Sequence, residues 1–371
     1  MKNIERVMLS PAVTRSRVET PYVVVIIPAH NEAEHITEAV NALWGQTRRP
    51  DAIIVSADNC TDDTISLAEA AGADVFITEG NSHKRAGAVN QPLQWLLPHL
   101  KDHDIVAMVD ADTKLDPGFL ENAERLLKRR YHAVGPTFDV EPTWSIVTQL
   151  QNNEYARYSR ITERRGGKTL NLSGAAQTLR VEVIRAVVAA RVRGDLPGED
   201  AMYNTDAISE DMELTIAVKT LGFKTTASSR CRCVTDMMPT VKDLWVQRIR
   251  WIQGGMVELR RYGYTRVTKP MILRQYVTAF NVVFTLAWIS YSIYLTTILG
   301  WHRFDYTSQP IWGLITLFFA AERAFTARKA GWRGSLVAAL LVPELLYELF
   351  RQTVFVTSLV RHIRRTEIRW A

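Results

Sequence analysis

Two carboxylates follow an apolar segment in the first third of the chain. Residues 105–109 read Ile-Val-Ala-Met-Val, and Asp110-Ala111-Asp112 come next. Two acids at the point where a buried strand opens into a cleft suit a divalent cation and the diphosphate that the cation neutralises. Because Asp-x-Asp also occurs in ordinary surface loops, this interpretation depends on the residues around it.

A second acidic pair suits proton transfer. Glu210 and Asp211 follow Ser209 and begin a helical pattern that continues through Leu214 and Val218. A carboxylate with a raised pKa can remove the proton from a hydroxyl group. Acids also stabilise the N-terminus of a helix, which is the purely structural alternative for both residues.

The elements that would position these acids alternate between strands and helices. Apolar segments at 22–27, 53–55 and 75–77 predict strands, and a helical pattern follows each of them. Such alternation predicts an α/β fold with a parallel, doubly wound sheet, in which ligands bind beyond the carboxyl ends of the strands. The polar residues at these ends are Asn31, Asp58, Lys84 and Asp110.

Taken together, these motifs match a known pattern. In chain order they are Pro28-Ala29-His30-Asn31-Glu32, Asp58, Lys84-Arg85, Asp110-Ala111-Asp112, Ser209-Glu210-Asp211 and Gln247-Arg248-Ile249-Arg250-Trp251. The set resembles the family 2 glycosyltransferases, in particular the branch of cellulose, chitin and hyaluronan synthases with D, DxD, ED and QxxRW motifs. The match runs from Tyr22 to Gly255. One departure is Ser209, where many synthases have Thr.

The resemblance implies a fold and a reaction. The fold is of GT-A type, a Rossmann-like, mostly parallel sheet that is flanked by helices and binds a nucleotide sugar. The reaction is an inverting transfer from a nucleoside-diphosphate sugar, with UDP favoured over GDP and with Mn²⁺ or Mg²⁺ as cofactor. The acceptor is a hydroxyl group on a glycan, a lipid or a protein.

The resemblance also assigns roles to single residues. Asp211, with Glu210 beside it, matches the general base, and Asp112 matches the metal ligand. The positions that match donor-nucleotide ligands are Pro28, Ala29, His30, Asn31, Glu32, Asp58, Lys84 and Asp110. The positions that match the surroundings of the diphosphate and the acceptor are Gln247, Arg250, Trp251 and, in the small-residue segment 170–176, Gly174.

Several of these residues have simpler structural interpretations. Asn31 and Asp62 can be helix caps, and for Asp62 the cap is the favoured interpretation. His30 and His83 have no partner at metal-ligand spacing, which favours ordinary loop hydrogen bonds. Trp251 can pack in a core as readily as it can stack on a sugar.

Two rival functions belong to other classes. A nucleotidyltransferase with a similar sheet would not need the QxxRW motif or a base at Asp211. A non-catalytic membrane scaffold would not need intact candidate acids. The sequence therefore favours glycosyl transfer over both.

Composition limits the remaining classes. Cys60, Cys231 and Cys233 form no Cys-x-x-Cys pair, which argues against a disulfide scaffold or a zinc site and fits a reducing, cytoplasmic setting. The net charge is +6, and no basic stripe with interleaved aromatic residues predicts binding of nucleic acid. Residues 1–20 are charged and lack an apolar segment, so we predict no signal peptide.

The last third of the chain predicts membrane association. Residues 276–301 contain no charged residue, and this is longer than the roughly 20 apolar residues that a membrane-spanning helix needs. The apolar segment 310–321 is shorter. The segment 336–360 carries Glu344, Glu348 and Arg351 at helical spacing, which predicts an amphipathic helix at the membrane interface. Basic residues on both sides of this last segment place the catalytic part on the cytoplasmic face of the membrane.

These patterns divide the chain into three parts. Residues 1–20 form an N-terminal segment, residues 21–265 a GT-A catalytic domain, and residues 266–371 a C-terminal helical region with a transmembrane hairpin and an interfacial helix. Since all predicted spans follow the catalytic domain, we expect addition of one or a few sugars rather than export of a long polymer. The alternative is a soluble cytoplasmic homo-oligomer, in which the C-terminal region packs against copies of itself.

Overall fold

The structure is a computed structural model that describes residues 20–139, 141, 143–299 and 310–365. It divides into two compact units. The sheet unit comprises Met1–Asp139 and Tyr158–Asp236, and the helical unit comprises Val140–Arg157 and Met237–Ala371. The boundary predicted after residue 265 separates a catalytic domain from a C-terminal region. The two compact units divide the chain at other residues, so that boundary stays a prediction.

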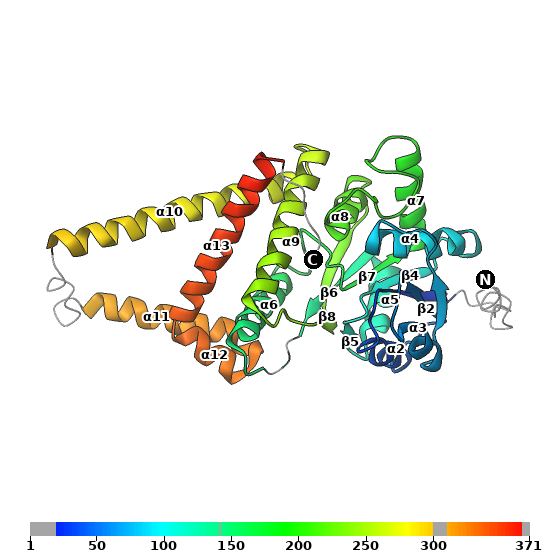
Figure 1. The fold of residues 1–371 in the computed structure, drawn as a ribbon, viewed down its shortest axis with the longest axis horizontal. Coiled ribbons are helices and arrows are strands. Elements are labelled where there is room, and N and C mark those ends of the chain that lie inside the picture. The colour runs from blue at the N-terminus through cyan, green and yellow to red at the C-terminus, as the bar shows by residue number, and fades with distance from the viewer. Residues whose placement is uncertain (1–19, 140, 142, 300–309, 366–371) are drawn as a thin grey trace. The chain divides into compact units, whose positions relative to one another are not determined.

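The sheet unit is built on a mixed, eight-stranded sheet (Figure 1). In spatial order its strands are β3 (Asp74–Ile77), β2 (Ala52–Ala57), β1 (Val23–Ala29), β4 (Ile105–Val109), β7 (Ala176–Arg180), β6 (Ala133–Phe138), β8 (Thr225–Val234) and β5 (Lys114–Leu115). The pairs β3–β2, β2–β1, β1–β4 and β6–β8 are parallel, and the other three are antiparallel. The predicted α/β fold with a mostly parallel sheet is confirmed.

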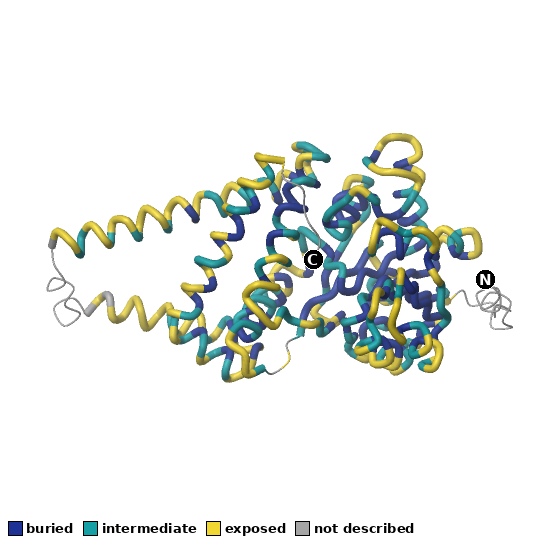
Figure 2. Tube along the Cα trace, viewed as in Figure 1, coloured by how far each residue is buried: buried dark blue, intermediate teal, exposed yellow. Residues whose placement is uncertain are grey.

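Buried strands form the centre of this unit. Every residue of β2 and β4 is buried, as is every residue of β1 except Pro28 (Figure 2). Branched apolar side chains fill both faces of these strands, as expected for a sheet that is covered on both sides. The helices of the unit are α2 (Ile36–Trp44), α3 (Thr64–Ala70), α4 (Lys84–Leu96), α5 (Phe119–Arg129), α7 (Val181–Val192) and α8 (Glu210–Thr220).

The segment 170–176 has an apolar, strand-like start in the sequence, but the strand lies further along the chain. Strand β7 begins only at Ala176. The backbone N–H of Leu172 donates to Thr215 Oγ1 at 3.0 Å, and that of Gly174 donates to Asp211 Oδ2 at 3.2 Å. Because these amides bond to side chains of α8, they are not available for a ladder with a neighbouring strand.

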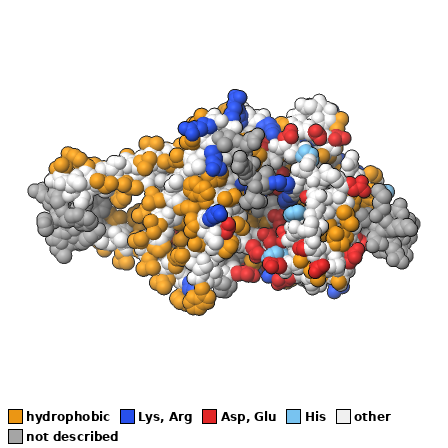
Figure 3. All heavy atoms as spheres, in the orientation of Figure 1, with side chains coloured by type: hydrophobic (Ala, Val, Ile, Leu, Met, Phe, Trp, Pro, Cys, Tyr) orange, Lys and Arg blue, Asp and Glu red, His pale blue; other side chains and the backbone are white. Residues whose placement is uncertain are grey.

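The helical unit contains α9 (Val241–Tyr262), α10 (Lys269–Leu299), α11 (Pro310–Ala327), α12 (Gly331–Ala339) and α13 (Val342–Ile363), and α6 (Ile146–Arg164) begins in it. Among the described helices, α10 alone is long and apolar enough to cross a membrane. Only 6% of its most apolar window is buried, so α10 is not a core helix of this unit. Figure 3 shows hydrophobic side chains along the visible faces of α10 and α11.

The amphipathic helix predicted at 336–360 is broken in two. Helix α12 ends at Ala339, and α13 begins after Leu341, whose φ is 58°. Pro343 lies in the first turn of α13, where the missing N–H of proline is tolerated, whereas a proline inside one continuous helix would interrupt its hydrogen bonds. The residue pattern indicated the helical period but missed this interruption.

The charged residues of α13 do not form a fully solvated face. Glu344 is 9% exposed and accepts hydrogen bonds from Arg157 Nη1 at 2.6 Å and from Asn153 Nδ2 at 3.0 Å. Tyr347 donates to Glu154 Oε2 at 2.7 Å. Glu344 was placed on the charged face of an interfacial amphipathic helix, but its charge is paired inside the helical unit.

Candidate active site

One edge of the sheet gathers the predicted site residues. Strands β1, β2 and β4 are parallel, so their carboxyl ends meet at this edge. Strand β7 runs the other way and begins there, with Ala176 opposite Val109. The backbone N–H of Asp110 donates to the carbonyl of Ala175 at 3.0 Å. This brings the first acid of the Asp-x-Asp motif next to Gly174, while the predicted residues Gln247, Arg250 and Trp251 belong to α9.

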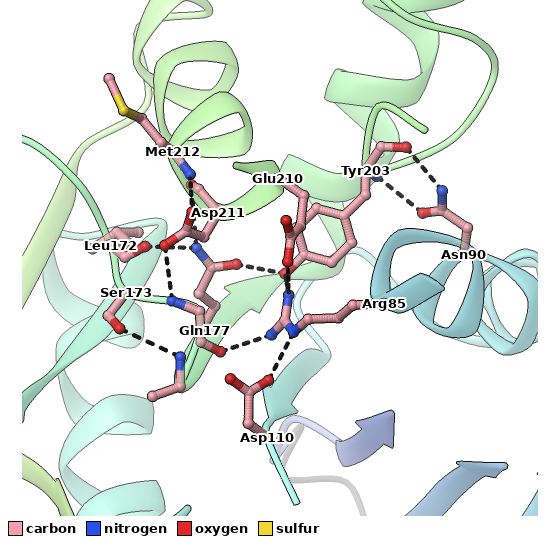
Figure 4. A network of polar contacts seen from close by, with 12 residues as sticks. Arg85, Asn90, Asp110, Leu172, Ser173, Gln177, Tyr203, Glu210, Asp211 and Met212 are labelled. Carbon is pink, nitrogen blue, oxygen red and sulfur yellow. Dashed lines mark hydrogen bonds and ion pairs between the residues drawn. The ribbon is translucent and has the colours of Figure 1, made fainter. Parts of the chain in front are cut away.

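Arg85 joins acids from two different loops (Figure 4). Its Nε donates to Asp110 Oδ1 at 2.7 Å, and its Nη1 donates to Glu210 Oε1 at 3.3 Å. Its Nη2 donates to the carbonyl of Gly174 at 2.7 Å. Burial alone would lower the pKa of Arg85, but Asp110, Tyr203 and Glu210 raise it well above its usual range. Arg85 is thus a permanent cation between the two acidic motifs.

Asp211 is held by hydrogen bonds on both of its oxygens. Oδ2 accepts from Asn171 Nδ2 at 3.1 Å and from the Gly174 N–H at 3.2 Å, and Oδ1 accepts from the Met212 N–H at 2.7 Å. Burial raises the pKa of Asp211, and these bonds together with the charge of Arg85 oppose the increase without cancelling it. A fixed carboxylate with a raised pKa has the properties of a general base.

Glu210 shares this environment. Burial raises its pKa as well, and Asp211 adds to the increase while Arg85 opposes it. Both acids lie in the first turn of α8, as their helix-terminal alternative requires, but they also bond outside that helix. A helix-terminal role therefore does not account for their contacts.

A concentration of negative charge surrounds Asp112. Burial and the nearby Asp110 raise the pKa of Asp112 to about 6, with smaller contributions from Asp236 and Glu32. Neighbouring carboxylates oppose each other's ionisation, and a cation removes that opposition. Within the described residues, no three His, Cys, Asp or Glu side chains converge as metal ligands. The chain thus offers one or two carboxylates, a number that suits a cation whose other ligands are water and phosphate oxygens.

The ends of β1 and β2 form a second polar cluster. His30 Nδ1 lies 2.6 Å from the carbonyl oxygen of Asp58, and Asp58 accepts a hydrogen bond from Thr78 Oγ1 at 2.8 Å. Asn31 has a φ of 56°, and its Oδ1 accepts from the Thr61 N–H at 2.8 Å. His30 therefore makes the kind of loop hydrogen bond that the sequence favoured, and Asn31, for which a helix cap was the alternative, bonds to the Thr61 N–H in the next loop.

Other donor-side residues are near these loops. Pro28 and Ala29 end β1, and the N–H of Glu32 donates to Thr64 Oγ1 at 2.8 Å. Asp62 accepts from the N–H of Thr64, the first residue of α3, at 3.1 Å, although the N-cap position itself is occupied by Asp63. Lys84 begins α4 with an exposed side chain. Arg85, which was not predicted to be a ligand, points into the acidic network instead.

The residue pattern missed four members of this network. They are Arg85, Asn171, Gln177 and Tyr203. Arg85 stood within a quoted motif but was not assigned a role. The other three carry no sequence signal, because their functional neighbours come from distant segments of the chain.

The QxxRW residues lie on α9, in the helical unit. There, Arg248 Nη2 donates to Glu154 Oε2 at 2.9 Å, and the Arg248 guanidinium carbon lies 4.7 Å from the centre of the Trp251 ring. Trp251 is 38% exposed, so it is not a core aromatic residue. The roles of Gln247, Arg250 and Trp251 at the diphosphate and acceptor remain predictions.

Comparison with known families decides the class of this chain. The model of glycosyl transferase family group 2 matches residues 105–348. The chain belongs to this family. The predicted family 2 glycosyltransferase is thereby confirmed, and the family supports neither nucleotidyl transfer nor a scaffold function.

Similar proteins are found at low identity. Poly-beta-1,6-N-acetyl-D-glucosamine synthase of Staphylococcus aureus (strain COL) is 24% identical over 272 residues, which are 71% of this chain and 61% of that protein. The synthase of Staphylococcus epidermidis is 23% identical over 276 residues, with the same coverage. The glycosyltransferase chain thus matches less than two thirds of the length of these relatives.

A solved structure is similar over nearly the whole chain. It is the mannosyltransferase PcManGT from Pyrobaculum calidifontis in complex with GDP-Man and Mn²⁺, with a TM-score of 0.58 and 19% identity. The alignment covers 99% of this chain and 94% of that one. This similarity confirms the predicted GT-A type of fold.

Proposed function

We propose that this glycosyltransferase transfers a sugar from a nucleoside-diphosphate sugar to an acceptor hydroxyl with inversion at the anomeric carbon. The observation that carries the proposal is the half-buried Asp211, both of whose carboxylate oxygens accept hydrogen bonds. It lies beside the end of the sheet at which Arg85 bonds to Asp110. Asp211 removes the hydroxyl proton, the hydroxyl oxygen attacks the anomeric carbon, and the bond to the diphosphate oxygen breaks. A single displacement of this kind inverts the configuration.

The donor side is assigned to the loops after β1, β2 and β4. We assign the nucleotide to Pro28, Ala29, His30, Asn31, Glu32, Asp58, Lys84 and Asp110. Gly174, whose N–H bonds to Asp211, belongs on the acceptor side. The assignment of Gln247, Arg250 and Trp251 to the diphosphate and acceptor rests on their motif alone.

A divalent cation, Mn²⁺ or Mg²⁺, is the proposed cofactor, and Asp112 is its proposed ligand. When bound, such a cation neutralises charge on the leaving diphosphate. The raised pKa of Asp112 supports this assignment, because burial and the negative charges of Asp110, Asp236 and Glu32 all oppose its ionisation.

Replacing Asp112 with Asn is expected to lower metal-dependent release of nucleoside diphosphate by about a hundredfold, since the contribution of a catalytic cation is several kcal/mol. The measurement is release from a panel of UDP- and GDP-sugars, with and without Mn²⁺ or Mg²⁺. A UDP-sugar is the expected donor, and the GDP-Man complex of the similar mannosyltransferase makes GDP-sugars the competing candidates.

Asp102→Asn is the matched control. Asp102 is exposed and precedes β4, at the opposite end of that strand from Asp112. Its replacement should leave release unchanged. Metal-dependent release at the wild-type rate by the Asp112 variant would refute the proposed metal site.

Membrane lipid is the second proposed partner, with the catalytic unit at the cytoplasmic face. Its support is α10, and the second span of the predicted hairpin would be α11, an 18-residue helix that contains Glu322 and Arg323. A soluble cytoplasmic oligomer is the alternative.

Phe284→Arg is expected to reduce the fraction of protein that stays in membranes after an alkaline wash. Phe284 is 61% exposed near the middle of α10, and an arginine at the centre of a span costs about 3 kcal/mol in insertion. Tyr264→Arg is the control, because Tyr264 is 71% exposed but precedes α10. Wild-type protein that is soluble without detergent and forms defined oligomers would contradict membrane insertion.

We propose addition of one or a few sugars. Because the similar staphylococcal proteins are synthases of a polymer, poly-beta-1,6-N-acetyl-D-glucosamine, a polymer is the second candidate product. Product length, measured by mass spectrometry, decides between them, and a processive ladder of long products would establish the polymer.

A further inference from the structure

Tyr203 is fully buried in the turn-rich segment before α8 (Figure 4). Its hydroxyl donates to Gln177 Oε1 at 2.6 Å and accepts from Arg85 Nη1 at 3.2 Å. Gln177 Nε2 donates to the carbonyl of Leu172 at 2.9 Å. The hydroxyl thus connects Arg85 with the segment that leads into Gly174.

Two anchors fix the position of Tyr203. Asn90 of α4 donates to the Tyr203 carbonyl at 2.8 Å and accepts from the Tyr203 N–H at 2.9 Å. Arg191 donates to the carbonyl of Met202 at 3.0 Å and forms a fully buried ion pair of 2.7 Å with Glu213 of α8. Tyr203 is therefore attached to both α4 and α8, so its hydroxyl is a fixed point.

Arg85 needs such a fixed point because its side chain is long and has many rotamers. The Tyr203 ring lies 5.4 Å from the Arg85 guanidinium carbon, and its hydroxyl bonds to Nη1. With Nη1 fixed, Nη2 is directed at the carbonyl of Gly174, whose own N–H donates to Asp211. A change in the orientation of the Arg85 guanidinium would therefore move Gly174 and, through its N–H, alter the hydrogen bond to Asp211.

We propose that Tyr203 is a positioning residue that holds Arg85 in the orientation linking Asp110 to Gly174 and so fixes Asp211. The inference rests on the proposed function, in which Asp211 is the base. It assigns a role to a side chain that touches neither the reacting atoms nor the donor.

Tyr203→Phe tests the proposal by removing only the hydroxyl. It leaves Gln177 Oε1 without the hydroxyl donor and leaves Arg85 Nη1 with Glu210 Oε1 alone, and we expect kcat to fall about tenfold. The KM for the donor should change by no more than about twofold, because the lost bond acts on the base and not on the nucleotide.

The pH profile separates positioning from general weakening of the fold. Asp211 must be ionised to accept a proton, and the charge of Arg85 lowers its pKa. A displaced Arg85 lowers that pKa less, so the acidic limb of kcat should move to higher pH by roughly half a unit in Tyr203→Phe. A purely structural role would reduce activity without moving the limb.

Tyr131→Phe is the matched control. Tyr131 lies between α5 and β6 in the same sheet unit, next to the strand start where Ala133 pairs with Leu179, at the end of the sheet away from Asp110. The substitution removes the same atom, and we expect wild-type kcat and an unmoved acidic limb.

Hydrogen exchange gives a second readout that does not depend on turnover. The amides of Gly174 and Met212 both donate to Asp211. We expect peptides that contain them to exchange faster in Tyr203→Phe than in Tyr131→Phe. The positioning role would be wrong if the amides of Gly174 and Met212 exchanged equally in the two variants. It would also be wrong if the acidic limb of Tyr203→Phe coincided with that of the wild type. Absence of transfer by the wild-type protein would instead refute the proposed function, and the exchange comparison would still decide the role of Tyr203.

Discussion

Asp211→Asn is expected to abolish sugar transfer while leaving the donor nucleotide bound. Loss of a general base lowers kcat by about 10² to 10⁴. The amide is close in shape to the carboxylate, so the bonds from Asn171 and Gly174 to one oxygen can persist. The measurement is kcat for transfer, with nucleotide affinity from calorimetry beside it.

The pH dependence of the wild-type enzyme tests the same assignment. Burial raises the pKa of Asp211 above that of an ordinary aspartate. Because the base must be ionised, kcat should rise with pH through this raised pKa and fall away on the acidic side. An acidic limb at the ordinary value of about 3.9 would contradict a buried base.

Two variants make the assignment specific. Asp102→Asn changes an exposed acid at the other end of β4 and should be fully active. Glu210→Gln removes the acid adjacent to Asp211, which bonds to Arg85 but does not share the contacts with Asn171. An active Asp211→Asn enzyme together with an inactive Glu210→Gln enzyme would transfer the role of base to Glu210.

The sheet edge was predictable from sequence because strand order follows simple rules. Parallel strands place their carboxyl ends together, so Asn31, Asp58 and Asp110 were expected at one edge before any contact was known. The pattern did not show which of two adjacent cations points inward. Lys84 has a φ of 52° and begins α4, and the rotation of the helix start then directs Arg85 to the acids.

Long-range contacts account for what the pattern missed. Tyr203 meets Arg85 across 118 residues of sequence, and nothing local to either residue indicates the pairing. The burial of Glu344 was missed for a related reason. Helical spacing places charged residues on one face, but it does not show whether that face meets water or, as here, Arg157.

Arg85→Met is expected to have the broadest effect of any single substitution in the network. It removes the cation that Asp110 and Glu210 share; a fully buried pair broken in this way costs about 3–5 kcal/mol, and we expect less here because Arg85 is 19% and Asp110 33% exposed. The pKa values of Glu210 and Asp211, which Arg85 holds down, should rise further. Transfer at neutral pH should be lost, and kcat and melting temperature measured across a pH series would show it.

The direction of the pH effect follows from proton binding. Without Arg85, the folded protein holds protons on these acids that the unfolded chain has released, so the melting temperature of the variant should rise as pH falls through the raised pKa values. Residual activity should change in the opposite direction, because Asp211 ionises only at higher pH. Arg85→Lys keeps the charge but not the planar set of donors, and should recover part of the stability and little of the activity. Arg193→Met, which breaks an exposed pair with Asp195, is the control. If Arg85→Met matched this control in melting temperature and kcat, the central role of Arg85 would be wrong.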